Sequence, residues 1–159
     1  MTLQTGMMLL AAKMPLDMMI SKMSEGMVET LKIFFLTLLF SLPLGLVIAF
    51  GRMAKNRIIR YIVTVYIAIM RGTPLMLQVM AIYFGPNYLL HIRIPRSYRF
   101  IAIIVAFALN YAAYFAEIYR SGIESMPVGQ YEASRLLGYN KAQTFFKIIL
   151  PQVIKRILP

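Results

Sequence analysis

The sequence contains no cysteine, one histidine and only six acidic residues, against 17 lysines and arginines. The absence of cysteine excludes disulfide bonds and cysteine-ligated metal sites. One histidine without zinc-type spacing leaves no candidate metal site, and we expect no catalytic residue and no cofactor. The net charge of +11 is compatible with nucleic-acid binding, but the basic residues lie between long apolar runs, as in the loops of membrane proteins. We therefore expect no nucleic-acid partner.

The composition predicts a membrane protein. Hydrophobic residues make up 60% of the chain and charged residues 14%, whereas an average soluble domain has about 45–50% and about 25%. Residues 33–51 and 100–120 each have about the 20 apolar residues that a transmembrane helix needs. Pro43 and Gly45 lie inside the first span, where neighbouring helices can satisfy a freed carbonyl. A buried helix of a soluble protein is the weaker alternative.

A third apolar segment, residues 61–86, is interrupted at "RGTP" by Arg71, Gly72 and Pro74. It is either two short segments or one long broken helix. As one helix of about 26 residues it would reach roughly 39 Å, at about 1.5 Å per residue. That length crosses a hydrocarbon core of about 30 Å with some tilt.

The basic loops do not decide the topology, because residues 52–60 and 93–99 are similarly rich in arginine. The number of times that residues 61–86 cross the membrane is more informative. If residues 61–86 cross once, the loop at 52–60 and the polar segment at 131–152 lie on the same, cytoplasmic side. If they cross twice, the two lie on opposite sides. We favour the single broken crossing.

The expected organisation is an N-terminal interfacial or flexible segment, residues 1–26, followed by one transmembrane domain, residues 27–159. Met7–Ala12 is too short for a secretory signal. Met14–Met23 places methionines near one helical face, so an interfacial helix and a flexible leader are both open. The fold class is an all-α membrane protein, a bundle of transmembrane helices with a cytoplasmic helical hairpin.

The hairpin is the stretch "YEASRLLGYNKAQTFFKIILPQ", which has the pattern of two short helices. Pro127 suits the first turn, with Ser125 as a cap, and Gly138 suits the left-handed residue after the first helix. Asn140 is placed to cap the second helix, and Pro151 should end or bend it. An apolar stripe is expected on the second helix at Ala142, Phe145, Phe146 and Ile149.

Two roles for the hairpin remain open on these grounds. It is either an ordinary loop folded back on its own protein or a docking element. In the second case Ala133 permits close approach, while Glu132 and Arg135 set the polarity of the contact.

Polar residues inside the apolar segments are candidates for a substrate path, because ionisable groups at membrane depth are costly and face the bundle interior. A broken helix that exposes backbone around Thr73 would also suit a polar ligand. The alternatives are structural: Arg71 pairs with Glu117 or snorkels, Glu117 pairs with Arg120, and the amides bond between helices. The candidates are Arg71, Thr73, Gln78, Asn110 and Glu117.

The hairpin resembles the EAA loop of binding-protein-dependent ABC importer permeases, whose pattern is E-A-A-x3-G-x9-I-x-L-P. Here Glu132, Ala133, Gly138 and the final "IILP" match, and Ser134 replaces the second alanine. "RGTPL", "YFGP" and "ALNYAAYFAEIYRSGIESMPVGQYEA" are similar to the permeases of histidine, glutamine and arginine uptake systems. The resemblance covers roughly residues 26–159.

The resemblance implies a coupling helix that sits in a cleft of a separate ATPase subunit. Coupling would involve Glu132, Ala133, Ser134, Arg135 and Gly138. The chain has no G-x-x-x-x-G-K-[ST] loop, so we expect ATP hydrolysis in another chain and no enzyme activity in this one. Implied partners are an ATPase dimer, a second permease copy or a paralogue, and an extracytoplasmic amino-acid-binding protein.

The implied location is the bacterial inner membrane, with several crossings. Members of this family usually have five spans, whereas three are visible here and the sequence stops at "KRILP", where a fourth should begin. We therefore expect a fragment of a longer permease. The rivals are a membrane scaffold or assembly protein that docks a partner other than an ATPase, and a channel.

Overall fold

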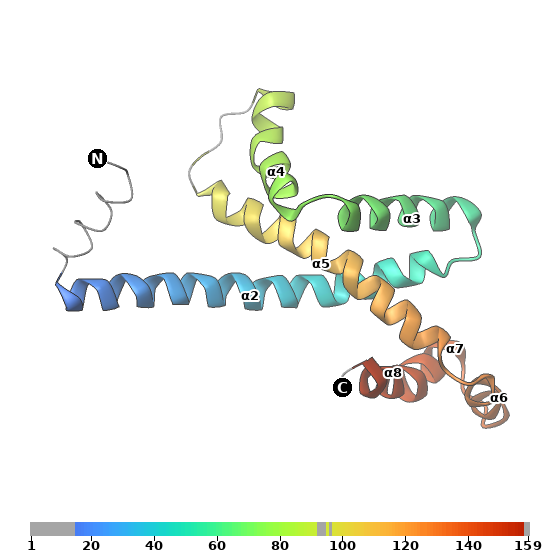
Figure 1. Cartoon of the computed structure of the whole chain (residues 1–159). Coiled ribbons are helices and arrows are strands. Elements are labelled where there is room, and N and C mark those ends of the chain that lie inside the picture. Colours follow the sequence, from blue (N-terminus) through green and yellow to red (C-terminus); the bar gives the residue numbers. More distant parts are fainter. Residues whose placement is uncertain (1–14, 92–94, 96, 158–159) are drawn as a thin grey trace. The chain divides into compact units, whose positions relative to one another are not determined.

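The computed structural model describes residues 15–91, 95 and 97–157, and all regular structure in these ranges is helical. The chain divides into two units, residues 1–36 and residues 37–159. Figure 1 shows the order of the elements. Among the described residues, two helices are long and apolar enough to cross a membrane, or up to three spans if the one bent pair counts as a single span.

Helix α2 runs from Leu16 to Arg52 and contains the expected span at 33–51. Pro43 lies inside α2 without ending it, as predicted. The helix is also unbroken at residue 26, where we expected the N-terminal segment to end, and the second unit begins only at Thr37. Met7–Ala12 and Met14 lie outside the described residues, and the interfacial role of residues 1–26 stays a prediction.

Helix α5, Tyr98–Glu124, is the central element of the second unit, and most of its buried residues are alanines. It meets α2 at Gly45, where a Cβ would lie 2.7 Å from the Phe115 Cβ and 3.2 Å from the Ala112 carbonyl. Without a hydrophobic drive between helices in lipid, small residues allow this close backbone approach. The buried face of α2 in this unit has the same character: Thr37, Ser41, Gly45 and Ala49.

Helices α3, Arg57–Gly72, and α4, Leu75–Leu90, pack one after the other along α5 (Figure 1). The chain turns by 109° between them, at Thr73 and Pro74. The expected interruption at "RGTP" is confirmed, but a single long helix with a roughly 39 Å reach is wrong. Pro74 provides no backbone donor and Thr73 is extended, so the α3 ladder stops there. A single broken crossing stays a prediction.

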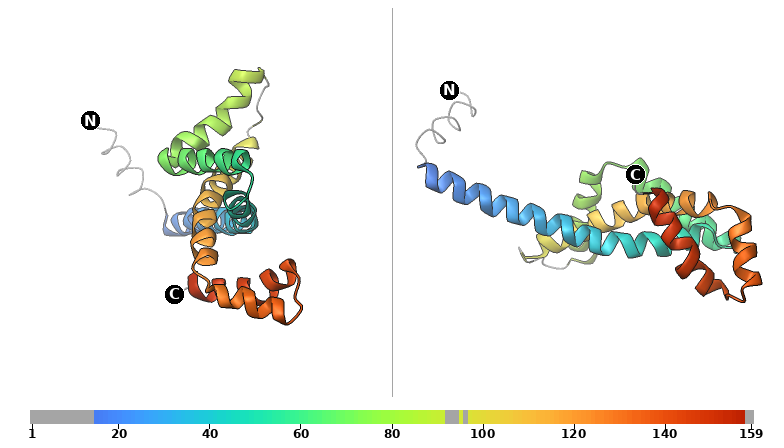
Figure 2. Two further views of the ribbon diagram at one scale, coloured as in Figure 1. Left: turned by 90° about the vertical axis from the view of Figure 1, so that its right-hand side faces the viewer. Right: turned by 90° about the horizontal axis from the view of Figure 1, so that it is seen from below.

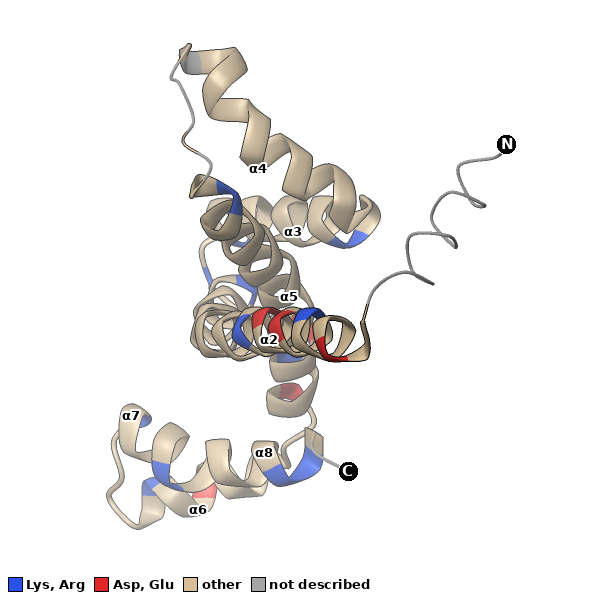
Figure 3. Ribbon diagram, turned by 90° about the vertical axis from the view of Figure 1, so that its left-hand side faces the viewer, with Lys and Arg blue, Asp and Glu red and all other residues tan. Residues whose placement is uncertain are grey.

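The C-terminal elements form a hairpin against the end of α5 (Figure 2). They are α6 at Val128–Leu136, α7 at Lys141–Gln143, the π-helix η1 at Thr144–Ile149 and α8 at Leu150–Ile157. Figure 3 shows a difference in charge within the second unit: α4 carries no charged side chain, whereas α6 and α8 carry several. The hairpin is therefore the polar end of this unit.

Candidate functional site

The turn of the hairpin is closed at both ends by hydrogen bonds between near neighbours in sequence. Gly138 has φ 77°, which an L side chain rarely adopts. Its N–H donates to the Arg135 carbonyl at 3.0 Å, and the Tyr139 N–H donates to the Ser134 carbonyl at 3.0 Å, which is the Schellman motif.

The second half of the turn is a capping box. The Asn140 side chain accepts from the Gln143 N–H at 2.8 Å, and the Gln143 side chain accepts from the Asn140 N–H at 3.0 Å. The turn at Gly138 and the cap at Asn140 are confirmed.

The start of the hairpin differs from expectation. Pro127 is the N-cap residue of α6, with no side-chain cap, and not its first helical residue. Ser125 belongs to α5: it is the C-cap of that helix, and its hydroxyl donates to the Gly122 carbonyl at 2.7 Å. The predicted Ser125 cap of α6 is therefore wrong, because that hydroxyl is already used by the preceding helix.

The prediction that Pro151 ends the second helix is wrong, and a bend at Pro151 stays a prediction. The helix continues to Ile157, and η1 lies directly before the proline. Pro151 cannot donate to the carbonyl four residues earlier and its ring crowds that carbonyl. A π-helical turn, which is wider than an α-turn, accommodates both effects.

The wider turn changes which side chains are buried. Ile149 is fully buried with Val153 and Met126, and Phe145 packs against this cluster. Phe146 and Ala142, which the α-helical spacing placed in the same stripe, are exposed. The predicted stripe is thus half correct, and the error comes from assuming a regular period of 3.6 residues.

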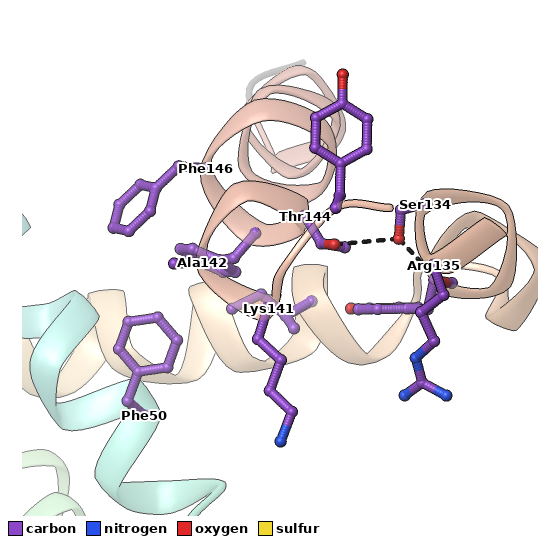
Figure 4. A pocket seen from close by; sticks show the side chains of 11 residues that line it. Phe50, Ser134, Arg135, Lys141, Ala142, Thr144 and Phe146 are labelled. Atoms are coloured by element: carbon purple, nitrogen blue, oxygen red, sulfur yellow. Dashed lines mark hydrogen bonds between the residues drawn. The ribbon is translucent and has the colours of Figure 1, made fainter. Parts of the chain in front are cut away.

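Ser134 is 1% exposed and joins the two halves of the hairpin. Its hydroxyl donates to the Tyr131 carbonyl at 2.8 Å and accepts from the Thr144 hydroxyl at 3.1 Å (Figure 4). Sequence reasoning treated Ser134 as a small residue that permits close packing and missed this bond. The available signal was a second buried hydroxyl, Thr144, across the turn.

The surface of α6 and its turn combines charged side chains with exposed leucines. Glu132, Ala133, Arg135 and Gly138 are all exposed. Leu136 and Leu137 are 90% and 74% exposed and were not singled out from the sequence. Large apolar side chains presented to solvent beside charges are typical of a contact surface.

A cavity of about 520 Å³ lies beside the hairpin. Phe50 from α2 and Phe146 from η1 line it, together with Arg135 and Lys141 (Figure 4). Tyr131 also lines the cavity, and burial raises the pKa of its phenol above its ordinary value.

The hairpin is fixed to the C-terminal end of α5. At Gly122 a Cβ would lie 2.8 Å from the Val153 Cγ1 and 2.9 Å from the Ile157 Cγ2, so α8 packs directly on the α5 backbone. The Arg156 guanidinium donates to the Ser125 carbonyl at 2.6 Å. The hairpin is therefore in direct contact with α5 at this end.

Three candidate substrate-path residues form one hydrogen-bonded cluster. Asn110 is 6% exposed, and its amide N–H₂ donates to the Gln78 side-chain oxygen at 3.0 Å and to the Met70 carbonyl at 2.9 Å. The Gln78 amide donates to the Thr73 hydroxyl at 2.7 Å. In this structure the amides bond between helices, which was one of the two open alternatives.

Arg71 and Glu117 line a different cavity, of about 440 Å³, together with Arg52 and Tyr114. The alternative in which Arg71 pairs with Glu117 is wrong: Arg71 lies over the Tyr114 ring, 5.3 Å from its centroid. Glu117 pairs with Arg120 at 2.8 Å, as predicted, and with Arg52 at 3.5 Å. The Arg52 contact was missed because it joins two distant helices. Among the described residues Arg71 has no carboxylate within ion-pair distance.

Apolar helices of spanning length, a bent helix pair and a capped polar hairpin packed on the end of a span define a helical membrane protein. Residues 41–159 match the family described as binding-protein-dependent transport system inner membrane component, and the chain belongs to this family. The predicted all-α membrane fold and the resemblance to amino-acid ABC permeases are thereby confirmed.

Relatives and a solved structure agree with this assignment. The chain is 38% identical over 135 residues to the "Putative glutamine transport system permease protein GlnP" of Rickettsia prowazekii (strain Madrid E), covering 85% of this chain and 61% of that one. It is 39% identical to the "Arginine transport system permease protein ArtQ" of Bacillus subtilis (strain 168), covering 85% and 60%. The chain thus spans about three fifths of these relatives.

The solved structure is titled "Crystal structure of an amino acid ABC transporter with histidines". It matches with a TM-score of 0.72 and 37% identity, over 92% of this chain and 68% of that one.

Proposed function

We propose that this chain is the membrane-spanning permease part of a binding-protein-dependent ABC importer for a polar amino acid. The observation that carries the proposal is the hairpin: a Schellman turn and a capping box present exposed charged and leucine side chains, and α8 ties them to the end of α5. Family membership and relatives named for glutamine and arginine transport support the substrate class.

The partners follow from the same proposal. An ATPase dimer in separate chains hydrolyses ATP, an extracytoplasmic binding protein delivers the amino acid, and a second permease copy or a paralogue completes the path. The complex lies in the bacterial inner membrane with several crossings, and the hairpin lies on its cytoplasmic face.

The coupling surface consists of the exposed positions of α6 and its turn. Glu132 and Arg135 supply charges of both signs, Ala133 permits close approach, and Gly138 sets the angle at which the second helix leaves. Ser134 acts from inside, because its bond to Thr144 holds α6 against η1. Leu136 and Leu137 add the apolar contact that such a dock requires.

The substrate path involves the Arg71 cavity and the neighbouring break between α3 and α4. Glu117 is already paired with two arginines, so the guanidinium of Arg71 is the group open to a substrate carboxylate. Thr73, Gln78 and Asn110 shape the break beside it. Uptake by Arg71→Ala should fall with assembly intact, and unchanged uptake would remove Arg71 from the path.

Co-purification from native membranes tests the coupling role, with the full-length gene product as bait. We expect an ATPase subunit to bind the wild type and to be lost from Glu132→Arg and Gly138→Trp. Glu29→Arg is the matched control, because Glu29 is an exposed glutamate on α2, outside the hairpin. If no ATPase appears, the scaffold function replaces the importer. If both hairpin variants retain the ATPase, the hairpin is not its docking site and the coupling role is wrong.

A further inference from the structure

The break between α3 and α4 leaves the last carbonyls of α3 without their α-helical donors, and the first of these is the Met70 carbonyl. In an α-helix the N–H of residue i bonds to the carbonyl of residue i−4. The partner of the Met70 carbonyl would be the N–H of residue 74, which is proline. The preceding bond, from the Thr73 N–H to the Ile69 carbonyl, is present at 3.1 Å. The defect therefore begins at Met70.

Two side-chain amides supply the missing donor. The Asn110 N–H₂ donates to the Met70 carbonyl at 2.9 Å, and the Gln78 N–H₂ donates to it at 3.0 Å. Asn110 uses its second N–H on the Gln78 oxygen at 3.0 Å, so the two amides are also joined to each other. A buried carbonyl without a donor is costly, which explains why a polar residue lies in the alanine-rich face of α5.

Of the two amides, Asn110 is the one that belongs to a different element. Gln78 lies on α4, one turn after the break, so it moves with the break itself. Asn110 lies on α5, 40 residues from Met70 in the chain. The hairpin packs on the same helix at Gly122 and Ser125. One continuous helix therefore contacts the hairpin at one end and the break near its middle.

We propose that Asn110 is a positioning residue that couples α5 to the α3–α4 break: its amide replaces the donor that Pro74 removes, so that the bend depends on the position of α5. Its use in transport rests on the importer function proposed above. The structural coupling between Asn110 and the α3–α4 break does not depend on the importer function.

The bend can be measured with one spin label on each helix. The chain has no cysteine, so Ile62→Cys on α3 and Tyr88→Cys on α4, both at exposed positions, give a specific pair. In lipid nanodiscs we expect a narrow distance distribution for the labelled parent. Asn110→Leu, which keeps the branched shape and the number of side-chain heavy atoms and removes the donor, should broaden it.

Tyr66→Phe is the matched control. It removes another α3–α5 hydrogen bond, from the Tyr66 hydroxyl to the Leu109 carbonyl at 2.7 Å, away from the break. It should leave the distribution narrow. If Asn110→Leu also leaves it narrow, or if Tyr66→Phe broadens it equally, the proposal is wrong.

Pro74→Ala tests the donor replacement directly, because alanine restores an N–H to residue 74. When Pro74→Ala is already present, Asn110→Leu should no longer change the distribution. An equal change with and without Pro74→Ala overturns the proposal. If Asn110→Leu alone does not fold, folding of the double variant supports donor replacement. Failure of both means that Asn110 is needed for packing alone.

The transport arm uses the assembled importer. Asn110→Leu should retain the ATPase subunit and lower the amount of amino acid moved per ATP by roughly fivefold or more, the effect of one unmade buried hydrogen bond. Pro74→Ala should make the Asn110 substitution neutral on that ratio. If the distance results hold but no ATP-dependent uptake exists, the importer function fails and the structural coupling remains. If uptake exists and the ratio is unchanged, Asn110 has no role in transport.

Discussion

Two of the helix interruptions in the second unit, the one between α3 and α4 and the one between α6 and α7, are closed by hydrogen bonds in different ways. At Gly138 every hydrogen bond of the turn comes from residues in the same hairpin, with Ser134 and Thr144 the most distant pair, ten positions apart. At Pro74 one of the donors comes from Asn110, which is 40 positions from its acceptor.

The sequence separation of the hydrogen-bond partners indicates which of the two breaks depends on the rest of the fold. Local partners cost little loop-closure entropy, so the hairpin turn carries its own determinants. The α3–α4 break relies in part on a helix that must already be packed beside it. The hairpin is thus suited to keep its shape against a partner, whereas the break is suited to respond when α5 moves.

The largest effect is expected where the hairpin packs on α5 at Gly122. The turn of the hairpin is held by its own residues, but this contact joins the hairpin to a helix that is distant in the sequence. Gly122→Ala places a Cβ within 2.8 Å of the Val153 side chain, and we expect a loss of about 1–3 kcal/mol of stability from overpacking. Thermal unfolding in detergent measures it. Gly85→Ala, where a Cβ meets nothing within 4 Å, is the control.

Adding Val153→Ala to Gly122→Ala should restore part of the loss, since the two side chains compete for one space. Strictly additive losses would mean that α8 does not press on Gly122.

The second prediction separates the glycine of the turn from a glycine inside α6. Gly138→Ala forces an alanine to φ 77° and should cost about 1–2 kcal/mol. Gly129→Ala, inside α6 and in open space, should instead stabilise by up to about 1 kcal/mol. Hydrogen exchange of the Tyr139 amide measures the change in stability for both variants. The same sign for both substitutions would contradict the assigned turn.

The third prediction compares two asparagine caps. Asn140→Ala should cost about 1 kcal/mol and increase exchange at the Gln143 amide. Asn56, which caps α3 by accepting from the Ile58 N–H at 2.9 Å, provides the matched Asn56→Ala variant. Gln143→Ala should affect only the hairpin, through the second bond of the box. If Asn140→Ala does not change the stability of the hairpin or exchange at the Gln143 amide, contacts with other elements and not the capping box hold the turn.

The same contrast explains what could be predicted from the sequence. Gly138 and Asn140 act on their immediate neighbours, so their residue types were sufficient to predict the turn. The spans were recognisable from length and apolarity, and Pro74 marked the position of the break. The π-helix before Pro151 was not predictable, because a proline within a helix can be accommodated by a break, a kink or a wider turn.

The candidate site was predicted as a set of residues but not as an arrangement. Thr73, Gln78 and Asn110 were singled out as polar groups in apolar segments, yet the acceptor that Gln78 and Asn110 share is a backbone carbonyl, which has no signature in the sequence. The Arg52–Glu117 contact depends on which helices pack together. Side-chain identity fixed what each residue can bond to, and packing decided which partner it met.

The smallest effect is expected from Thr73→Val, which keeps the shape of the side chain at the break and removes one hydroxyl. Gln78 loses its acceptor at 2.7 Å but keeps the Met70 carbonyl and the Thr73 carbonyl, so we expect a loss of only about 0.5–1 kcal/mol in thermal unfolding. Thr30→Val is the matched control: its hydroxyl bonds only to the carbonyl four residues earlier, at 2.9 Å, as the Thr73 hydroxyl also does at 2.8 Å. If Thr73→Val lowers the stability as much as Asn110→Leu does, the residues of the break itself support the bend more than α5 does. Both interruptions would then be closed mainly by local hydrogen bonds.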